Sequence, residues 1–207
     1  MSTSPLSFDP YVVQNMPGPV YLDIGCGYGK WGFLLRNYRG MDYPGELKIT
    51  GVDLFQPHID SLQDKGIYDE LKCCSATELP FEDQSFDSAV CCEVLEHLTR
   101  PEGPKLFAEL KRVCRQGFVI TTPFYDCIRG GGETLDGFNP YEAHQYCYKA
   151  AEFRDLGFTQ MVGVGMQLPS WKASVALSSL SYFFPKRARY GIGYWWRDGA
   201  ERTIGNE

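Results

Sequence analysis

Short apolar segments alternate along this chain with stretches in which apolar residues recur at helical spacing. The apolar segments predict β-strands at residues 20–24, 48–53, 71–75, 86–92, 118–122 and 158–164. The stretches between them predict helices at residues 30–38, at 58–65, in a segment that ends near 113, and at 150–156. Such alternation is typical of α/β proteins. We therefore expect a single Rossmann-like domain with a doubly wound, mostly parallel sheet and helices on both faces.

The chain is less regular outside this pattern. Residues 1–18 carry three prolines, and we expect them to form an irregular N-terminal lead-in. The α/β domain is expected to span residues 19–184, and residues 185–207 are expected to be a C-terminal extension. Within the domain, residues 171–184 fit a helix or a strand. A length of 207 residues agrees with one domain.

A long segment without predicted strands or helices follows the fifth strand, at residues 124–147. Loops of this length in compact domains are more often functional than idle. Because the loop leaves the carboxyl end of a strand, we expect it to overhang the edge of the sheet where such folds bind ligands.

A glycine-rich turn directly follows the first strand, in the run Asp23-Ile24-Gly25-Cys26-Gly27-Tyr28-Gly29. Glycines let the backbone turn sharply and approach a ligand closely. The helix that follows offers free N–H groups at its start. The position of the turn therefore predicts a cofactor site at the carboxyl edge of the sheet.

Asp53 ends the second strand, where a carboxylate can accept hydrogen bonds from both hydroxyls of a ribose. A nicotinamide oxidoreductase would also carry this pair of features, but its fingerprint is G-x-G-x-x-G. Here Gly29 follows Gly27 after a single residue. The acidic Asp23 also suits a cofactor with a cationic amino-acid tail better than one with a pyrophosphate.

These motifs together resemble class I S-adenosylmethionine-dependent methyltransferases over roughly residues 18–165. The matching parts are Asp23–Gly29, Asp53, the stretch Ala76-Thr-Glu-Leu-Pro-Phe-Glu-Asp-Gln-Ser-Phe-Asp87, and Glu93-Val-Leu-Glu-His97. The resemblance implies S-adenosylmethionine as cofactor, and it assigns the domain at 19–184 to that class.

The same resemblance gives individual residues a role. Asp23, Gly25, Gly27 and Gly29 would hold the methionine part of the cofactor, and Asp53 its ribose. Ala76 and Thr77 would flank the adenine, and Glu93 is a further candidate cofactor ligand. The chain departs from the family at Ser75, where an aspartate often contacts the adenine amine.

A candidate metal site follows the fourth strand. Glu93, Glu96 and His97 have helical i, i+3 and i+4 spacing, so we expect them on one face of a helical turn. Carboxylates and imidazoles are ligands for Mg²⁺, Mn²⁺ or Zn²⁺. His144, in the long loop, is expected at the same edge of the sheet. The segment resembles the metal-assisted small-RNA 3′-terminal 2′-O-methyltransferases and the ubiquinone-pathway O-methyltransferases.

An interpretation without metal is equally open. A Glu-His pair after the fourth strand is common in metal-free members of the superfamily. In that case His97 or His144 is the candidate general base, because histidine titrates in the useful pH range.

Composition narrows the set of partners. The formal net charge is −6, which argues against a long nucleic acid as acceptor unless basic residues cluster. One partial cluster, which is either solvated surface or a phosphate-facing patch, comprises Lys186, Arg187, Arg189, Arg197 and Arg202. The N-terminus resembles no signal peptide, no apolar run is long enough to span a membrane, and the 8 cysteines are expected to be reduced. These features predict a cytoplasmic protein.

We therefore expect a methyltransferase that modifies a hydroxyl of a small molecule such as a sugar, a nucleoside or a catechol, with a divalent metal as a candidate helper. The alternatives are a metal-free small-molecule O- or N-methyltransferase with a histidine base, and a non-catalytic methyltransferase-like subunit. The oligomeric state is left open by the sequence.

Overall fold

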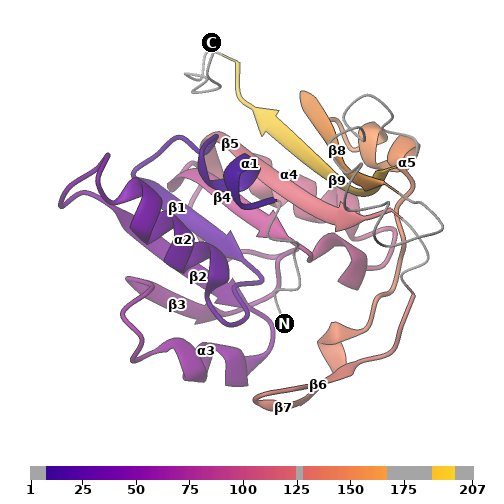
Figure 1. The fold of residues 1–207 in the computed structure, drawn as a ribbon, viewed down its shortest axis with the longest axis horizontal. Helices are drawn as coiled ribbons and strands as arrows, with labels where there is room; N and C mark the ends of the chain where they lie inside the picture. The colour runs from indigo at the N-terminus through magenta and orange to yellow at the C-terminus, as the bar shows by residue number, and fades with distance from the viewer. Residues whose placement is uncertain (1–7, 125–127, 167–187, 199–207) are drawn as a thin grey trace.

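The protein was analysed as a computed structural model that describes residues 8–124, 128–166 and 188–198. A seven-stranded sheet forms its centre, with the strand order β3-β2-β1-β4-β5-β9-β8 (Figure 1). The strands are β1 (Val20–Ile24), β2 (Lys48–Asp53), β3 (Glu70–Cys73), β4 (Phe86–Cys92), β5 (Cys114–Pro123), β8 (Gln160–Met166) and β9 (Ala188–Trp196). The α-helices are α1 (Asp9–Val13), α2 (Lys30–Arg39), α3 (Gln56–Leu62), α4 (Gly103–Val113) and α5 (Ala150–Asp155).

The first five strands of the sheet run parallel, and the last two pairings are antiparallel. The strand order reverses at β1, which lies between β2 and β4. In doubly wound sheets ligands bind outside the carboxyl ends of the strands at this reversal. The predicted fold class is therefore confirmed, and it places the ligand site at the ends of β1, β2 and β4.

Helices cover both faces of the sheet because the strands present apolar side chains on both sides. In β4, Ala89 and Cys91 pack in a core with α4 and α5, whereas Val90 and Cys92 pack in a second core with α1 and α2. Successive side chains of a strand point to opposite faces, which explains how one strand serves two cores. Figure 1 shows α1 and α2 on the near face, with α4 behind the strands.

Two parts of the expected domain organisation need correction. Residues 9–13 of the lead-in form α1, whose buried Val12 and Val13 pack on the sheet. Residues 188–196 of the expected extension form β9, which pairs with β5 on one side and with β8 on the other. Because both of its edges are paired, this strand lies inside the sheet and is part of the domain. Residues 171–184 lie outside the described part of the chain.

The long loop after β5 contains a small two-stranded hairpin, β6 (Gly132–Thr134) and β7 (Gly137–Asn139), and a short 3₁₀ turn at Pro140–Glu142. The hairpin extends from the body of the domain in Figure 1, at the side where the carboxyl ends of the parallel strands lie. The loop thus overhangs this edge, as its place after the fifth strand predicts.

The cysteines depart from the expectation at one residue. Cys147 takes part in a disulfide, so the expectation of reduced thiols throughout is wrong there. The free cysteines of the described part are Cys26, Cys73, Cys74, Cys91, Cys92 and Cys114. Across the described ranges, no helix has both the length and the apolar character needed to cross a membrane.

Candidate functional site

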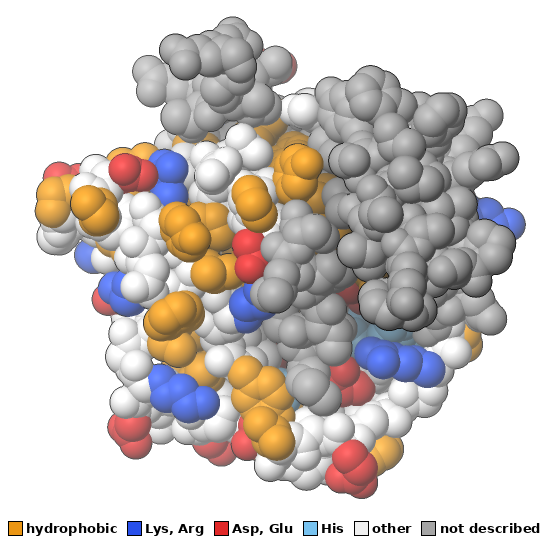
Figure 2. All heavy atoms as spheres, in the orientation of Figure 1, with side chains coloured by type: hydrophobic (Ala, Val, Ile, Leu, Met, Phe, Trp, Pro, Cys, Tyr) orange, Lys and Arg blue, Asp and Glu red, His pale blue; other side chains and the backbone are white. Residues whose placement is uncertain are grey.

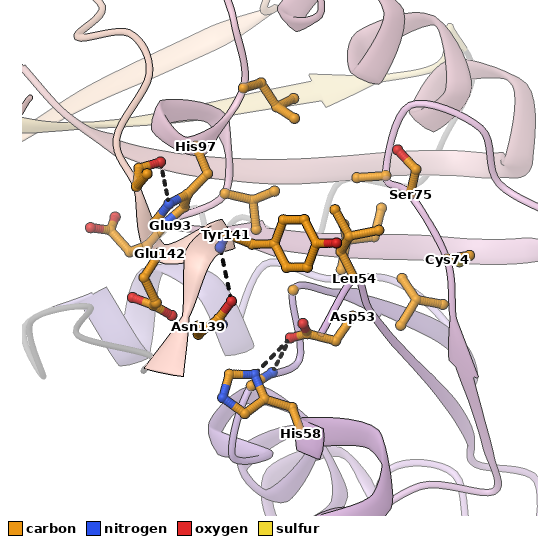
Figure 3. A pocket seen from close by; sticks show the side chains of 18 of the residues that line it. Asp53, Leu54, His58, Cys74, Ser75, Glu93, His97, Asn139, Tyr141 and Glu142 are labelled. Atoms are coloured by element: carbon orange, nitrogen blue, oxygen red, sulfur yellow. Dashed lines mark hydrogen bonds and ion pairs between the residues drawn. The ribbon is translucent and has the colours of Figure 1, made fainter. Parts of the chain in front are cut away.

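A cavity opens at the carboxyl edge of the sheet (Figure 3). The glycine turn, the ends of β2 and β4, and residues 139–143 and 145 of the long loop line it. The predicted site residues that line the cavity are Gly25, Gly27, Asp53, Ala76, Glu93 and His97. Those that lie outside its lining are Asp23, Gly29, Thr77, Glu96 and His144.

The glycine turn adopts a backbone that only glycine accepts easily. Gly25, Gly27 and Gly29 have φ values of 69°, 49° and 87°. A Cβ at Gly25 would collide with the Val94 side chain. These left-handed conformations are costly for other residues. The turn therefore brings bare backbone to the wall of the cavity.

Asp53 is held at the end of β2 as an ionised hydrogen-bond acceptor. Its carboxylate accepts the N–H groups of Gly27 and Phe55, each at 2.9 Å, and lies 3.4 Å from Nδ1 of His58. Burial alone would raise the pKa of Asp53, but the contacts with His58 and with these N–H groups outweigh it and lower the pKa. Because a carboxylate has about four acceptor positions, Asp53 keeps room for hydroxyls of a ligand.

Asp23 has a different environment. It is fully buried, and its Oδ2 accepts the Gly32 N–H at 3.1 Å and the Tyr68 hydroxyl at 2.5 Å. Its Oδ1 has no hydrogen-bond partner within the described part of the chain. Burial raises the pKa of Asp23 to about 7. A cationic group beside this oxygen would favour the charged carboxylate. Asp23 itself lies beneath the glycine turn and does not line the cavity, so its predicted contact with the cofactor stays a prediction.

On the expected adenine side, the Ser75 and Thr77 hydroxyls lie 2.9 Å apart, and Ser75 Oγ also accepts the Thr77 N–H at 3.2 Å. Ala76 and Ser75 both line the cavity. The hydroxyl of Ser75 thus has partners of its own at the position where the family often has an aspartate.

Glu93 does not lie on a helical turn with Glu96 and His97, so that expectation is wrong. It has φ 57°, and its N–H bonds to the Thr121 carbonyl, which extends the pairing of β4 with β5. Only Leu95–His97 form a short 3₁₀ turn. The Glu93 carboxylate accepts from the Thr121 hydroxyl at 2.9 Å, and burial raises the pKa of Glu93 to about 7.

Glu96 and His97 come together instead with His144, which lies in the long loop far along the chain. One ligand atom from each lies within 4.8 Å of the others. Among the described residues, these three side chains form the group that could hold a metal ion. We call it the Glu96–His97–His144 cluster. The rings of its two histidines meet edge to face, with centroids 4.7 Å apart.

The surroundings of the cluster orient its side chains. The Ala143 carbonyl lies 3.2 Å from Nδ1 of His97, and Glu96 accepts from the Thr122 hydroxyl at 3.1 Å. A carbonyl on one imidazole nitrogen leaves the other nitrogen available as a ligand. Burial, and then the charge of Glu93, raise the pKa of Glu96 well above its usual range, and burial lowers the pKa of His97. A divalent cation beside these groups would favour the charged form of Glu96 and the neutral form of His97.

Comparison with known proteins agrees with this geometry. Residues 22–121 match the methyltransferase domain family. For residues 22–121 this match bears out the prediction of a methyltransferase, and solved S-adenosylmethionine-dependent methyltransferases share the fold of the chain.

Among curated relatives, a tRNA (carboxymethyluridine(34)-5-O)-methyltransferase of Arabidopsis thaliana is 36% identical over 113 residues, which are 53% of this chain and 25% of that protein. The chain thus spans a quarter of the length of this relative. A methyltransferase from Archaeoglobus fulgidus matches the fold with a TM-score of 0.59 at 16% identity, covering 92% of this chain and 91% of that one. Magnesium protoporphyrin IX methyltransferase from Synechocystis PCC 6803, solved with bound S-adenosylmethionine, matches with a TM-score of 0.57 at 16% identity, covering 93% and 77%.

One residue of this methyltransferase domain was missed from the sequence. His58 is 1% exposed, lines the cavity and faces Asp53. The available signal was a histidine in the predicted helix after Asp53, in a chain that has only 3 histidines. Helical spacing alone does not show that its side chain turns back toward the end of β2.

The basic cluster near the C-terminus divides between described and undescribed residues. Arg197 donates to the carbonyls of Lys111, Cys114 and Arg115, so it is a structural residue that ties the end of β9 to α4 and β5. Lys186, Arg187 and Arg202 lie outside the described residues. On the face drawn in Figure 2, Lys and Arg side chains of the described part are interleaved with Asp and Glu.

Proposed function

We propose that this chain is an S-adenosylmethionine-dependent O-methyltransferase that modifies a hydroxyl of a small molecule such as a sugar, a nucleoside or a catechol. A divalent ion held by the Glu96–His97–His144 cluster would assist it. The observation that carries the proposal is this cluster, which reaches the cavity through His97 beside a glycine turn and Asp53.

The cofactor side of the cavity is proposed to work through fixed groups. The glycine turn would lie against the methionine part, Asp53 would accept from the ribose, and Ala76 with Thr77 would flank the adenine. The bound cofactor supplies an activated methyl group. The task of the protein is then to align that group with the attacking oxygen, and rigid positioning of this kind gives a large rate gain.

The acceptor side is proposed to lie where Glu93 and His97 meet residues 139–145 of the long loop. A bound divalent ion lowers the pKa of a hydroxyl near it. Glu96 and the two histidines would hold that ion, with Thr122 and Ala143 orienting them. Glu93 lines the cavity next to the cluster, which supports its proposed role toward the cofactor or the ion.

The acceptor is proposed to be small because the chain is acidic, with a net charge of −6. Some relatives are named as tRNA methyltransferases, so RNA has to be tried as an acceptor beside small molecules.

The cytoplasmic location expected from the sequence also stays a prediction.

Calorimetric titration tests the proposal most directly. S-adenosylhomocysteine, and then Mg²⁺, Mn²⁺ and Zn²⁺, are titrated into metal-stripped protein. We expect one binding event for the nucleoside and one for a metal, and we expect Glu96→Ala to lose the metal event. Glu46→Ala, which changes an exposed glutamate, is the matched control and should keep both events.

The other outcomes separate the alternatives. Nucleoside binding without any metal event would favour the metal-free enzyme, with His97 or His144 as general base. Binding without transfer to small hydroxyl compounds or to total tRNA would favour a non-catalytic subunit. Binding of NADH in place of S-adenosylhomocysteine would contradict the proposed cofactor.

A further inference from the structure

We infer that the acceptor stacks on the ring of Tyr141, in the long loop. The acceptor then carries a planar ring beside two adjacent hydroxyls, as a catechol or a nucleoside does. The inference rests on the proposed function and narrows it, because it removes simple sugars from the expected acceptors.

The backbone around Tyr141 is held by the short 3₁₀ turn at Pro140–Glu142. Pro140 begins this turn, and proline pre-sets the backbone torsion at such a position. The Tyr141 N–H donates to the Asn139 side-chain oxygen at 2.9 Å. The Ala143 N–H donates to the Pro140 carbonyl at 3.3 Å. Tyr141 therefore projects from a turn that is hydrogen-bonded at both ends.

The turn is attached to the Glu96–His97–His144 cluster. The Ala143 carbonyl lies 3.2 Å from Nδ1 of His97, and the Gln145 N–H donates to the Glu96 carbonyl at 2.8 Å. The contacts that orient His97 thus also set the place of Tyr141. A side chain positioned in this way is prepared for a ligand before the ligand arrives.

The Tyr141 side chain lies in the cavity and leaves much of its ring uncovered. It lines the cavity and is 50% exposed. Figure 3 shows the ring between His97 on one side and Leu54 and Ser75 on the other. A second ring that stacked on Tyr141 would therefore lie inside the cavity, beside His97. Offset or edge-to-face contact with such a ring is favourable beyond the area that it buries.

Polar side chains on this side of the cavity are already engaged within the protein. The Glu93 carboxylate accepts from a hydroxyl of β5 at 2.9 Å. The Asn139 side chain is 3% exposed and accepts the Tyr141 N–H. Glu142 forms an ion pair with Arg129 at 3.8 Å. A simple sugar has a hydroxyl on nearly every carbon, and many of these would find no partner here.

Apolar side chains supply much of the remaining lining beside the cluster. They are Val94, Leu98, Pro140, Tyr141 and Ala143. A planar ring can bury its face against them and present only two hydroxyls to the ion that the cluster is proposed to hold. The acceptor that fits is therefore apolar on its face and polar at one edge or on one attached sugar.

The test measures methyl transfer to catechol, to uridine and to methyl α-mannoside, which all have adjacent hydroxyls, at saturating S-adenosylmethionine and Mg²⁺. The wild type should use catechol or uridine in preference to the mannoside, and the better of the two identifies the source of the ring. We expect Tyr141→Leu to raise KM for that acceptor about three- to tenfold, with kcat within about twofold, because one aromatic contact is lost. Tyr141→Phe keeps the ring and should retain the wild-type KM.

Tyr38→Leu is the matched control, because Tyr38 is 63% exposed on α2 and lies outside the lining of the cavity. It should change neither constant. Calorimetry should also give Tyr141→Leu the affinity of the wild type for S-adenosylhomocysteine.

Three results would count against the inference alone and leave the proposed function standing. They are an unchanged KM in Tyr141→Leu, a preference of the wild type for the mannoside, and a loss of S-adenosylhomocysteine affinity in Tyr141→Leu that equals the rise in KM. The last result would assign the ring to the cofactor. If the wild type methylates none of the three acceptors, the proposed function fails and the inference fails with it.

Discussion

Carboxylates at the ends of neighbouring strands differ in protonation because their partners differ. Asp23 of β1 has one orphaned oxygen, so burial dominates and raises its pKa to about 7. Asp53 of β2 is also mostly buried, but His58 and two backbone N–H groups outweigh burial and lower its pKa. The same residue type therefore has two roles at one edge of the sheet, a proton-holding group and a permanent anion.

The anionic state of Asp53 makes its contribution to cofactor binding testable. Asp53→Asn is expected to weaken S-adenosylhomocysteine about 10- to 100-fold, because a hydrogen bond to a charged acceptor is replaced by one to a neutral amide. The lowered pKa also predicts that Asp53 stays charged from pH 5 to pH 8, so it should add no pH dependence in that range. Calorimetry at both pH values measures this, and exposed Asp60→Asn is the control. An unchanged affinity of Asp53→Asn would contradict the ribose assignment.

The raised pKa of Asp23 predicts an effect on stability. Between the unfolded value of 3.8 and the folded value of about 7, the folded state binds more protons than the unfolded state. Stability therefore falls as the pH rises through this window. The penalty at pH 8 is on the order of 4 kcal/mol at most, from about three pKa units. Asp23→Asn removes this penalty, so its stability relative to the wild type should rise from pH 5 to pH 8.

Chemical denaturation of both proteins at both pH values measures the difference. Asp64→Asn, at an exposed position, should show no such trend. A constant difference between Asp23→Asn and the wild type would mean that the carboxylate is already charged in the folded protein at pH 5.

At the scale of elements, the hairpin β6–β7 depends on contacts with the rest of the domain. Each of its strands has three residues, and Leu135 at the turn is 87% exposed. An isolated hairpin of this length is at best marginally stable in water. The Tyr28 hydroxyl accepts the Leu135 N–H at 2.8 Å, which ties the hairpin to the glycine turn. The glycine turn and the long loop thus share one hydrogen bond.

Tyr28→Phe removes that acceptor and keeps the ring beside His58. Loss of one hydrogen bond, worth about 1 kcal/mol, should speed amide hydrogen exchange across residues 132–139 about fivefold. Mass spectrometry of exchanged peptides measures this, with peptides from β4 as the internal reference. Unchanged exchange in the hairpin would show that other contacts hold it in place.

At the scale of the whole molecule, glycines let the last strand enter the sheet. A Cβ at Gly117 of β5 would collide with the Trp196 ring and would lie 2.5 Å from the Trp195 carbonyl oxygen. Gly191 and Gly193 of β9 likewise face the rings of Phe124 and Phe158. The glycines of β5 and β9 thus leave room for aromatic side chains where β9 pairs with its neighbours.

Gly117→Ala is therefore expected to lower stability by about 1–3 kcal/mol, the usual cost of overpacking. Thermal unfolding measures the change. Gly130→Ala is the matched control, because a Cβ there would meet nothing within 4 Å. A melting temperature of Gly117→Ala equal to that of the wild type would contradict the close packing of β5 against β9.

Local patterns were enough to predict most of the sheet and the glycine turn at its carboxyl edge. The strands ending at Ile24, Asp53 and Cys92 were predicted at the observed positions, because apolar runs and glycine punctuation are local signals. β9 was missed because two glycines, Gly191 and Gly193, interrupt its apolar run, and its partners at 117–123 are distant in the sequence. The helical placement of Glu93 failed because its N–H continues the sheet ladder to Thr121.

The position of β9 also bears on how the chain folds during synthesis. Strand β8 pairs with β9 alone, and β9 bridges β8 to β5. Until residues 188–196 leave the ribosome, β5 and β8 both present open edges, and open edges invite aggregation. The parallel strands that hold the glycine turn and Asp53 are synthesised well before that point. The ligand-binding half of the sheet can therefore form first, while the nascent chain has to be protected until its last strand closes the gap.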